Sequence, residues 1–400
     1  LPLPSLPPSP PNPLKNHDVL FSTLYPSSLS SLIIYNQYPR FNNMSLQDWP
    51  EPIVRVQSLS DSGLASIPDR YVKPPIDRPL VTSGPSDATN IPIIDLSALF
   101  GGDEALQATT RAQIGSACRE WGFFQVVNHG VDPELMDKGR EAWRGFFHSP
   151  MDTKLAYANS PKTYEGYGSR LGVQKGAILD WSDYYFLHYL PLCLKDFNKW
   201  PAVPDNCREV IDEYGKQVLE LCGRIMRVLS VNLGLEDDIL QNAFGGEDVG
   251  ACLRVNFYPK CPQPDLALGL SSHSDPGGMT VLLPDSHVVG LQVRKDDSWI
   301  TVKPAPHAFI VNIGDQIQVL SNAIFKSVEH RVIVNSAQER ISLAFFYNPK
   351  SNIPIEPVKE LVSSETPSLY PPMTFDEYRL YIRKRGPQGK SQVESLKSPR

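Results

Sequence analysis

One short motif and its distant partner limit the folds that this chain can adopt. His273 and Asp275 stand two residues apart, and His330 follows Asp275 by 55 residues. Residues at i and i+2 of a β-strand point to the same side, so His273 and Asp275 can meet one ion while the residue between them points away. Apolar runs typical of strands follow these positions, at 279–283 and 332–334. The sequence therefore predicts that strands of a β structure carry these side chains.

Two imidazoles and one carboxylate on one side of an ion are the ligand set of non-haem iron sites. A lone His-x-Asp is weak evidence in a chain with eight histidines, so the inference depends on the joined context. Three protein ligands on one face leave positions for a chelating keto acid and dioxygen, which favours Fe(II) over Zn(II). We therefore predict that His273, Asp275 and His330 are the metal ligands and the catalytic centre. The other histidines lack a partner at ligand spacing and are expected to be structural or solvated: His17, His129, His148, His188, His287 and His307.

Further motifs accompany these residues in a fixed order. They occupy residues 91–96, 121–130, 256–262, 291–293, 312–315 and 340–342. Together they resemble the plant Fe(II)/2-oxoglutarate-dependent dioxygenases over about residues 46–400, without departure from the metal and co-substrate pattern. Within that family, the chain is most similar to the jasmonate-induced oxygenases, which hydroxylate the plant hormone jasmonic acid. The stretches that carry this likeness are residues 49–57, 164–170, 180–186 and 386–390.

The resemblance implies an activity. Fe(II) and 2-oxoglutarate would support an oxygenation by dioxygen, with ascorbate as a reductant. For jasmonic acid the resemblance points to hydroxylation at carbon 12, giving 12-hydroxyjasmonic acid together with succinate and carbon dioxide. Such a reaction would lower the active hormone and damp defence signalling.

The co-substrate residues are expected on two strands. Arg340 and Ser342 are assigned to the distal carboxylate of 2-oxoglutarate, because a guanidinium pairs bidentately with a carboxylate and a hydroxyl adds a donor. The resemblance also implies co-substrate contacts for Asn256 and Tyr258. Arg254 has the same parity as these two residues, so it would face the same interior.

A charge that points into a barrel is costly unless an anion meets it, and jasmonic acid is a carboxylate. Arg379 offers a second cation, and Phe375 shares its helix face at i, i+4 spacing. We therefore expect Arg254 and Arg379 to clamp the substrate carboxylate. The apolar wall of the substrate site is expected to comprise Phe186, Phe346 and Phe375.

Two alternatives stay open. A flavonoid-oxidising enzyme, similar to anthocyanidin or flavonol synthases, would keep the iron site but would not need Arg254 and Arg379 for a neutral polyphenol. A metal-free hormone-binding module would need neither turnover nor iron, although the intact set of ligands argues against it.

Composition limits the partners. The net charge is −6, and no basic stripe is present, so nucleic acid is not an expected partner. No run of eighteen apolar residues exists, so no membrane span is predicted. The six cysteines form no C-x-x-C pair and are typical of reduced thiols in a cytoplasmic protein.

The predicted fold class is mixed α/β with an all-β core. We expect a double-stranded β-helix, or jelly roll, flanked by an amino-terminal helical domain and a carboxy-terminal lid helix. The expected parts are a disordered extension at 1–45, a surface-wrapping segment at 46–90, a domain with a long helix at 91–245, the jelly roll at 246–350 and a lid segment at 351–400. Seven prolines occur in the first thirteen residues, and Met44 is taken as the true start rather than a transit segment.

Periodicity and caps predict the regular elements. Strands are expected at 91–96 and 123–127, and helices at 104–120, 133–147, 208–232 and 374–385. The first of these helices should bury Leu106, Ile114 and Cys118. Asp132 is expected to cap the second helix, and Thr374 with Glu377 should form a capping box on the last.

Overall fold

The computed structural model describes residues 49, 51–79, 90–162, 164–169, 175–385 and 389–397. Residues 46–400 form one compact unit. The predictions for residues 1–43 lie outside the described residues. The finer division of residues 46–400 into a wrapping segment, two domains and a lid stays a prediction.

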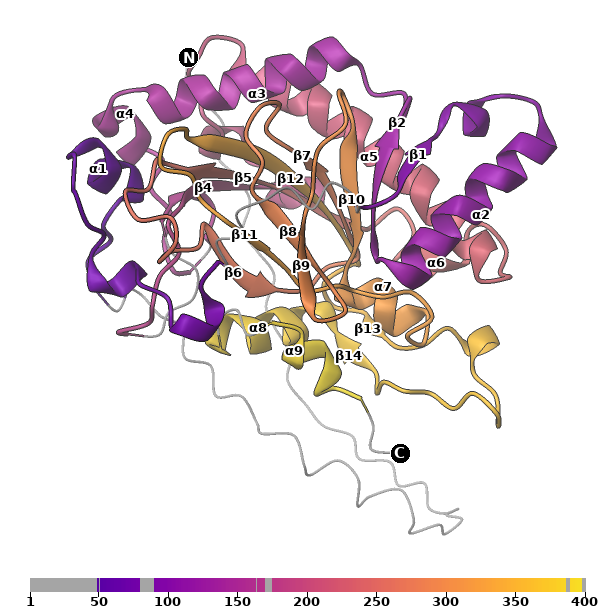
Figure 1. The fold of residues 1–400 in the computed structure, drawn as a ribbon. Coiled ribbons are helices and arrows are strands. Elements are labelled where there is room, and N and C mark those ends of the chain that lie inside the picture. The colour runs from indigo at the N-terminus through magenta and orange to yellow at the C-terminus, as the bar shows by residue number, and fades with distance from the viewer. Residues whose placement is uncertain are drawn as a thin grey trace, which may run out of the picture. The chain divides into compact units, whose positions relative to one another are not determined.

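Two β-sheets form the centre of the protein (Figure 1). The larger has the strand order β1-β2-β10-β7-β12-β5-β4-β3, and the smaller has the order β6-β11-β8-β9. A two-stranded sheet, β13-β14, lies near the carboxyl end. The strands are β1 Ile93–Asp95, β2 Phe123–Val127, β3 Gly166–Gly168, β4 Asp183–Leu190, β5 Gly250–Tyr258, β6 Leu270–His273, β7 Met279–Leu283, β8 Leu291–Lys295, β9 Ser298–Thr301, β10 Phe309–Ile313, β11 His330–Val332, β12 Arg340–Asn348, β13 Pro354–Ile355 and β14 Met373–Thr374.

Helices cover the larger sheet and close one end of the barrel (Figure 1). Helices α3 and α5 pack on each other and on β12. Helices α8 and α9 lie at the opposite end of the molecule, near the smaller sheet. The α-helices are α1 Val56–Asp61, α2 Glu104–Glu120, α3 Pro133–His148, α4 Met151–Leu155, α5 Cys207–Asn232, α6 Ile239–Ala243, α7 Asp315–Leu320, α8 Phe375–Arg385 and α9 Ser391–Glu394.

All four predicted helices are confirmed, with ends within one residue of the prediction. The Asp132 side chain accepts a hydrogen bond from the Glu134 amide and caps α3. The Thr374 hydroxyl accepts from the Glu377 amide at 3.2 Å, while the Glu377 carboxylate accepts from the Thr374 amide at 2.9 Å, which completes the capping box of α8. One buried position is wrong. Leu106 is 56% exposed, because α2 buries side chains only from Thr110 onward.

Two expected strands are shorter than predicted. The first strand begins at Ile93, and the strand that carries His330 ends at Val332. Among the described helices, none combines the length and apolar character that crossing a bilayer requires. All six cysteines are free thiols.

The pleat of β12 divides the interior into two apolar clusters. Leu343 and Phe345 belong to the core shared with the helices. Ala344 and Phe346 belong to a second cluster or pack against it, on the opposite face of the same strand. Successive residues of a strand point to opposite faces, so one strand both anchors the helices and lines the barrel interior.

Residues 51–79, here called the amino-terminal strap, are fixed to the barrel by a buried carboxylate. The two oxygens of Asp183 on β4 accept from the amides of Val56 and Gln57, each at 2.9 Å. A second tie joins the Lys73 ammonium to Asp180 at 2.7 Å. The first amides of a helix have no partner within it, so Asp183 caps α1 from a distant strand.

We predict that Asp183→Ala destabilises the protein by about 2 kcal/mol, because it leaves two buried amides without acceptors. Urea unfolding measures the loss, and limited proteolysis should cut the variant within the strap. The matched control is Asp69→Ala, which removes an exposed acid from the same segment. An equal loss of stability in both variants would contradict the capping role.

Candidate active site

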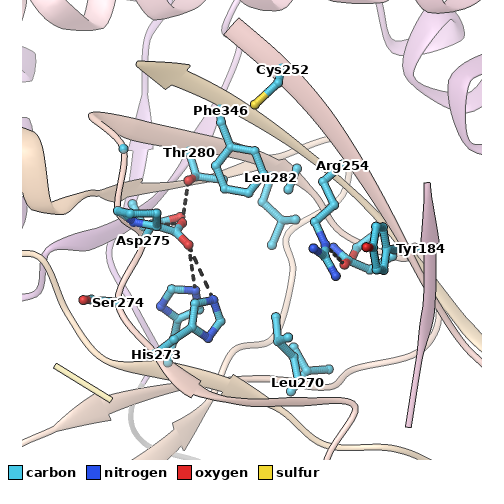
Figure 2. A pocket seen from close by; sticks show the side chains of 18 of the residues that line it. Tyr184, Cys252, Arg254, Leu270, His273, Ser274, Asp275, Thr280, Leu282 and Phe346 are labelled. Carbon is cyan, nitrogen blue, oxygen red and sulfur yellow. Dashed lines mark hydrogen bonds and ion pairs between the residues drawn. The ribbon is translucent and has the colours of Figure 1, made fainter. Parts of the chain in front are cut away.

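The three predicted metal ligands meet at one end of the smaller sheet. His273 is the last residue of β6 and pairs with His330, the first residue of β11, with 4.2 Å between the ring centroids. Asp275 lies beyond the end of β6, so the prediction that a strand carries it is wrong. The chain turns after His273, yet the Asp275 carboxylate still returns to the two imidazoles (Figure 2).

The ligand atoms are close enough to share one ion. Oδ1 of Asp275 lies 3.5 Å from Nε2 of His273 and 3.7 Å from Nε2 of His330. Both separations are below about 4.2 Å, which is twice a usual metal–ligand bond length. Within the described residues, these three form a group of His, Cys, Asp or Glu side chains able to hold a metal. The arrangement fits a 2-His-1-carboxylate iron centre.

Backbone carbonyls orient both imidazoles. Nδ1 of His273 hydrogen-bonds to the Ser271 carbonyl at 2.8 Å, and Nδ1 of His330 to the Val328 carbonyl at 3.1 Å. A carbonyl only accepts, so each Nδ1 carries the proton and donates it. The unprotonated Nε2 atoms therefore face Asp275, in the tautomer that a metal ligand requires.

A second set of contacts fixes the carboxylate. Oδ2 of Asp275 accepts from the Thr280 hydroxyl and from the Asn312 amide, the latter at 2.8 Å. The Asp315 amide donates to the Asp275 carbonyl at 2.8 Å. Gly314 lies against this loop so closely that a Cβ atom there would be 2.3 Å from the Gly277 carbonyl oxygen. Oδ1 is thereby left directed at the imidazoles.

Charges in the cluster favour a bound cation. Burial alone would raise the pKa of Asp275, but His330, His273 and the Thr280 hydroxyl outweigh it and hold that pKa well below its usual range. Burial lowers the pKa of His330 to about 4, so this imidazole is neutral at physiological pH. Burial also lowers the pKa of His273, but the negative charge of the nearby Asp275 carboxylate prevails and raises it. An ionised carboxylate facing imidazole nitrogens is a ready cation site.

A cavity of about 290 Å³ extends from the ligands between the two sheets. All twelve residues predicted for the site line it: Phe186, Arg254, Asn256, Tyr258, His273, Asp275, His330, Arg340, Ser342, Phe346, Phe375 and Arg379. They come from β4, β5, β6, β11, β12 and α8, together with the loop after β6. Sequence-distant elements thus converge on one interior.

Strand pairing places the polar residues of one wall. The β5–β12 register sets Arg340 opposite Tyr258 and Ser342 opposite Asn256. Arg340 is 4% exposed, its guanidinium lies 5.2 Å from the Tyr258 ring centroid, and its Nη1 is 3.5 Å from the Ser342 hydroxyl. This buried fork with an adjacent hydroxyl can bind a carboxylate bidentately.

The same strand pair also carries Arg254, on β5 opposite Ala344. Its guanidinium stacks on the Tyr184 ring, 3.9 Å from the centroid, and its Nε donates to Oδ1 of Asn256 at 2.6 Å. Figure 2 shows this side chain across the cavity from Asp275. Burial lowers the pKa of Arg254, so a bound anion would relieve part of the cost of its charge.

Helix α8 brings Phe375 and Arg379 to the cavity. Phe375 is buried, and its ring centroid lies 5.0 Å from the Arg379 guanidinium. Arg379 also forms an ion pair with Asp376 and donates to the Ser351 hydroxyl at 3.4 Å. Asp376 therefore neutralises part of the Arg379 charge. It lies only three residues away, but the prediction did not take this ion pair into account.

The sequence analysis missed several lining residues. Tyr184 stacks on Arg254, and Thr280 and Asn312 hold Asp275. Asn312 stands in the 312–315 motif and Tyr184 in the 180–186 stretch. Both stretches supported the family resemblance, but neither residue was assigned a role in the site. Other residues line the cavity without having had a predicted role: Tyr164, Cys252, Leu270, Leu282, Asn348, Ile382 and Gln392.

Family comparisons agree with this geometry. Residues 249–349 match the 2OG-Fe(II) oxygenase superfamily, and residues 91–203 match the non-haem dioxygenase in morphine synthesis N-terminal family. The chain belongs to the 2OG-Fe(II) oxygenase superfamily. It is a dioxygenase that uses Fe(II) and 2-oxoglutarate, and the predicted jelly-roll fold is confirmed.

Particular relatives narrow the group. Jasmonate-induced oxygenase 2 of Arabidopsis thaliana is 70% identical over 356 residues, which cover 89% of this chain and 96% of the relative. Leucoanthocyanidin dioxygenase of Malus domestica is 38% identical, over 81% of this chain and 93% of the relative. A crystal structure of JOX2 in complex with 2OG, Fe and JA matches with a TM-score of 0.82 at 70% identity, over 88% of this chain and all of that one.

We predict that Thr280→Val lowers the affinity for Fe(II) about tenfold, because Asp275 loses a donor that orients it while the side-chain volume is kept. Anaerobic metal titration measures the effect. Thr109→Val is the control, since Thr109 is exposed on α2. Unchanged affinity in the Thr280 variant would exclude this contribution to the metal site.

Proposed function

We propose that this enzyme hydroxylates jasmonic acid at carbon 12, using Fe(II), 2-oxoglutarate and dioxygen, with ascorbate as reductant. The observation that carries the proposal is the cavity in which the triad, a buried Arg–Ser pair and a second, partly buried arginine meet. The 70% identity with jasmonate-induced oxygenase 2 and the likeness to the JOX2 complex support the choice of substrate. In the cell, turnover would lower the active hormone and damp defence signalling.

His273, Asp275 and His330 would hold the iron. The bound Fe(II) supplies the activation of dioxygen, coupled to decarboxylation of 2-oxoglutarate to succinate and carbon dioxide. The protein contributes fixed ligand orientation through Ser271 and Val328, and a largely apolar interior that excludes water.

Arg340 and Ser342 would bind the distal carboxylate of 2-oxoglutarate. The guanidinium is buried and faces Tyr258. Burial raises the pKa of Tyr258, so the phenol stays neutral and can donate a hydrogen bond. Asn256 would contribute to 2-oxoglutarate binding indirectly, because its amide oxygen already accepts a hydrogen bond from Arg254.

Arg254 and Arg379 would hold the substrate carboxylate, and Phe186, Phe346 and Phe375 would surround the ring and pentenyl chain. Arg254 makes the larger contribution in this proposal, because it is stacked on Tyr184 and its charge is desolvated. Arg379 already pairs with Asp376, so its electrostatic attraction for a ligand carboxylate is weaker. A neutral flavonoid would leave the Arg254 charge without an anion, which favours the acid over the flavonoid alternative.

We also propose a cytoplasmic location. Its support is the set of six free cysteines, which is typical of a reducing compartment.

A turnover assay tests the proposed reaction. The protein is loaded anaerobically with Fe(II), 2-oxoglutarate and ascorbate, and jasmonic acid or a flavonoid is supplied before air is admitted. Mass spectrometry should find succinate and 12-hydroxyjasmonic acid in equal amounts. Succinate formed only with the flavonoid would keep the iron chemistry and discard the substrate, and no succinate with either would discard both substrates.

We predict that Arg254→Gln raises the KM for jasmonic acid at least tenfold, because a charged hydrogen bond to the substrate carboxylate is worth about 1.5–3 kcal/mol. The KM for 2-oxoglutarate should change less than threefold. Arg227→Gln, an exposed substitution on α5, is the control. Equal changes in both Michaelis constants would reject the clamp.

A further inference from the structure

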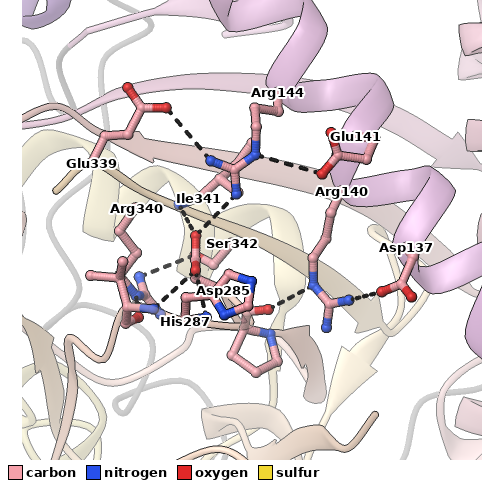
Figure 3. Close-up of polar contacts among 12 residues, drawn as sticks. Asp137, Arg140, Glu141, Arg144, Asp285, His287, Glu339, Arg340, Ile341 and Ser342 are labelled. Atoms are coloured by element: carbon pink, nitrogen blue, oxygen red, sulfur yellow. Dashed lines mark hydrogen bonds and ion pairs between the residues drawn. The ribbon is translucent and has the colours of Figure 1, made fainter. Parts of the chain in front are cut away.

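A buried acid outside the cavity lining stands behind the co-substrate wall. Asp285 follows β7 in the loop that leads to β8, and it is 2% exposed. Figure 3 shows its carboxylate between the start of β12 and helix α3. Neither the predicted site nor the family motifs quoted above include it.

Its carboxylate accepts three backbone hydrogen bonds from two segments. Oδ1 accepts from the amides of His287 and Val288 at 2.9 and 3.0 Å. Oδ2 accepts from the amide of Ile341 at 3.1 Å. One side chain therefore joins the β7–β8 loop to the first residues of β12.

These bonds enclose Arg340. Ile341 is its chain neighbour, so the bond from Asp285 fixes the backbone of β12 where the Arg340 side chain departs. Val288, whose amide binds Asp285, also contacts the Arg340 side chain, because its carbonyl accepts from Nε of Arg340 at 3.2 Å. Gly290 completes the enclosure, since a Cβ atom at this position would lie 3.0 Å from Cδ of Arg340. The backbone and the side chain of Arg340 are thus both held by segments that Asp285 joins, namely β12 and the β7–β8 loop.

The acid is ionised and braced from outside. Burial alone would raise the pKa of Asp285, but the amides of His287, Ile341 and Val288 outweigh it and keep that pKa below its usual range. On α3, Arg144 approaches Oδ2 at 3.5 Å, and Arg140 donates to the Pro284 carbonyl at 3.0 Å (Figure 3). The loop therefore has a fixed position against the helix layer.

We infer that Asp285 is a positioning residue that aims the Arg340 guanidinium at the distal carboxylate of 2-oxoglutarate. The inference rests on the proposed role of Arg340 in binding the co-substrate. A bidentate pair depends on the direction of the fork, so a guanidinium that can swing loses part of its affinity although its charge is unchanged. Asp285 acts on the co-substrate and leaves the jasmonate side of the cavity untouched.

The test is Asp285→Asn. The remaining carbonyl oxygen can keep the His287 and Val288 amides, whereas the new NH₂ group meets the Ile341 amide and cannot accept from it. The KM for 2-oxoglutarate should rise about tenfold, with the KM for jasmonic acid within twofold of the parent and kcat within threefold. Binding of 2-oxoglutarate to the Mn(II)-loaded protein, measured by calorimetry, should weaken by the same factor.

Asp137→Asn is the matched control. Asp137 pairs with Arg140 on α3 at 2.6 Å, and its side chain is 57% exposed, so the variant removes an acid from the same charge network without touching β12. Both Michaelis constants should equal those of the parent. If Asp137→Asn raised the KM for 2-oxoglutarate as much as Asp285→Asn does, the effect would belong to the network and the inference would be wrong.

A substrate analogue gives a second measurement. 2-Oxobutyrate keeps the keto acid and lacks the distal carboxylate, so its binding should be indifferent to Asp285. The preference for 2-oxoglutarate over 2-oxobutyrate should therefore fall about tenfold in Asp285→Asn. A Michaelis constant does not depend on the folded fraction, so partial unfolding cannot imitate this result. An unchanged preference would overturn the inference.

Arg340→Lys separates this inference from the function on which it rests. If Asp285 acts through Arg340, Asp285→Asn should add little to the KM increase in the Arg340→Lys background. A KM for 2-oxoglutarate raised by Arg340→Lys and untouched by Asp285→Asn would reject Asp285 alone, and no change in either variant would reject the role of Arg340. Should Asp285→Asn not fold, Arg144→Gln should shift the same preference two- to threefold, and its absence counts against the inference.

Discussion

The antiparallel pairing of β5 with β12 is the constraint on which the interior depends. It sets Arg340 beside Tyr258, Ser342 beside Asn256 and Ala344 beside Arg254 in one register. A slip of one residue would turn these side chains toward the helices and bring Leu343 and Phe345 into the cavity. The apolar core under α3 and α5 opposes that slip, because burying those residues is worth about 1.5–3 kcal/mol each. The packing of the helices thus protects the polarity of the site.

The arginines that line the cavity carry a desolvation cost, which a bound anion would offset. Arg340 carries its charge in a buried position and Arg254 in a partly buried one, and among the described residues neither guanidinium donates a hydrogen bond to a carboxylate. Carbonyl and amide oxygens satisfy part of each guanidinium and leave the rest for a ligand. The two arginines stand on opposite strands of one pair, so two carboxylates can be bound without competing for one cation. Both proposed organic ligands are acids, which matches this division.

Sequence periodicity was sufficient for the elements whose contacts are local. The cap of α3, the capping box of α8 and the buried face of α5 follow from spacing alone, and strand parity put Arg254 and Phe346 on the interior side. It failed where geometry is set from a distance. Asp275 lies beyond the end of the strand, where backbone amides of Gly314 and Asp315 bind the loop that carries it. Asp285 gave no signal, since its partners are backbone amides, which almost any residue type supplies, and the amide of Ile341 is 56 residues away in the sequence.

The metal end and the substrate end of the cavity share one buried residue. The Asp315 amide donates to the carbonyl of Asp275, and the Asp315 carboxylate accepts from Tyr378 on α8 at 2.6 Å. Tyr378 stands between Phe375 and Arg379 in the helix, so the position of the substrate wall is tied to the loop that carries a metal ligand. A displacement of α8 must break a buried hydrogen bond to a carboxylate, which costs about 1.5–3 kcal/mol. This hydrogen bond therefore holds α8, with Phe375 and Arg379, in a defined position relative to the loop that carries Asp275.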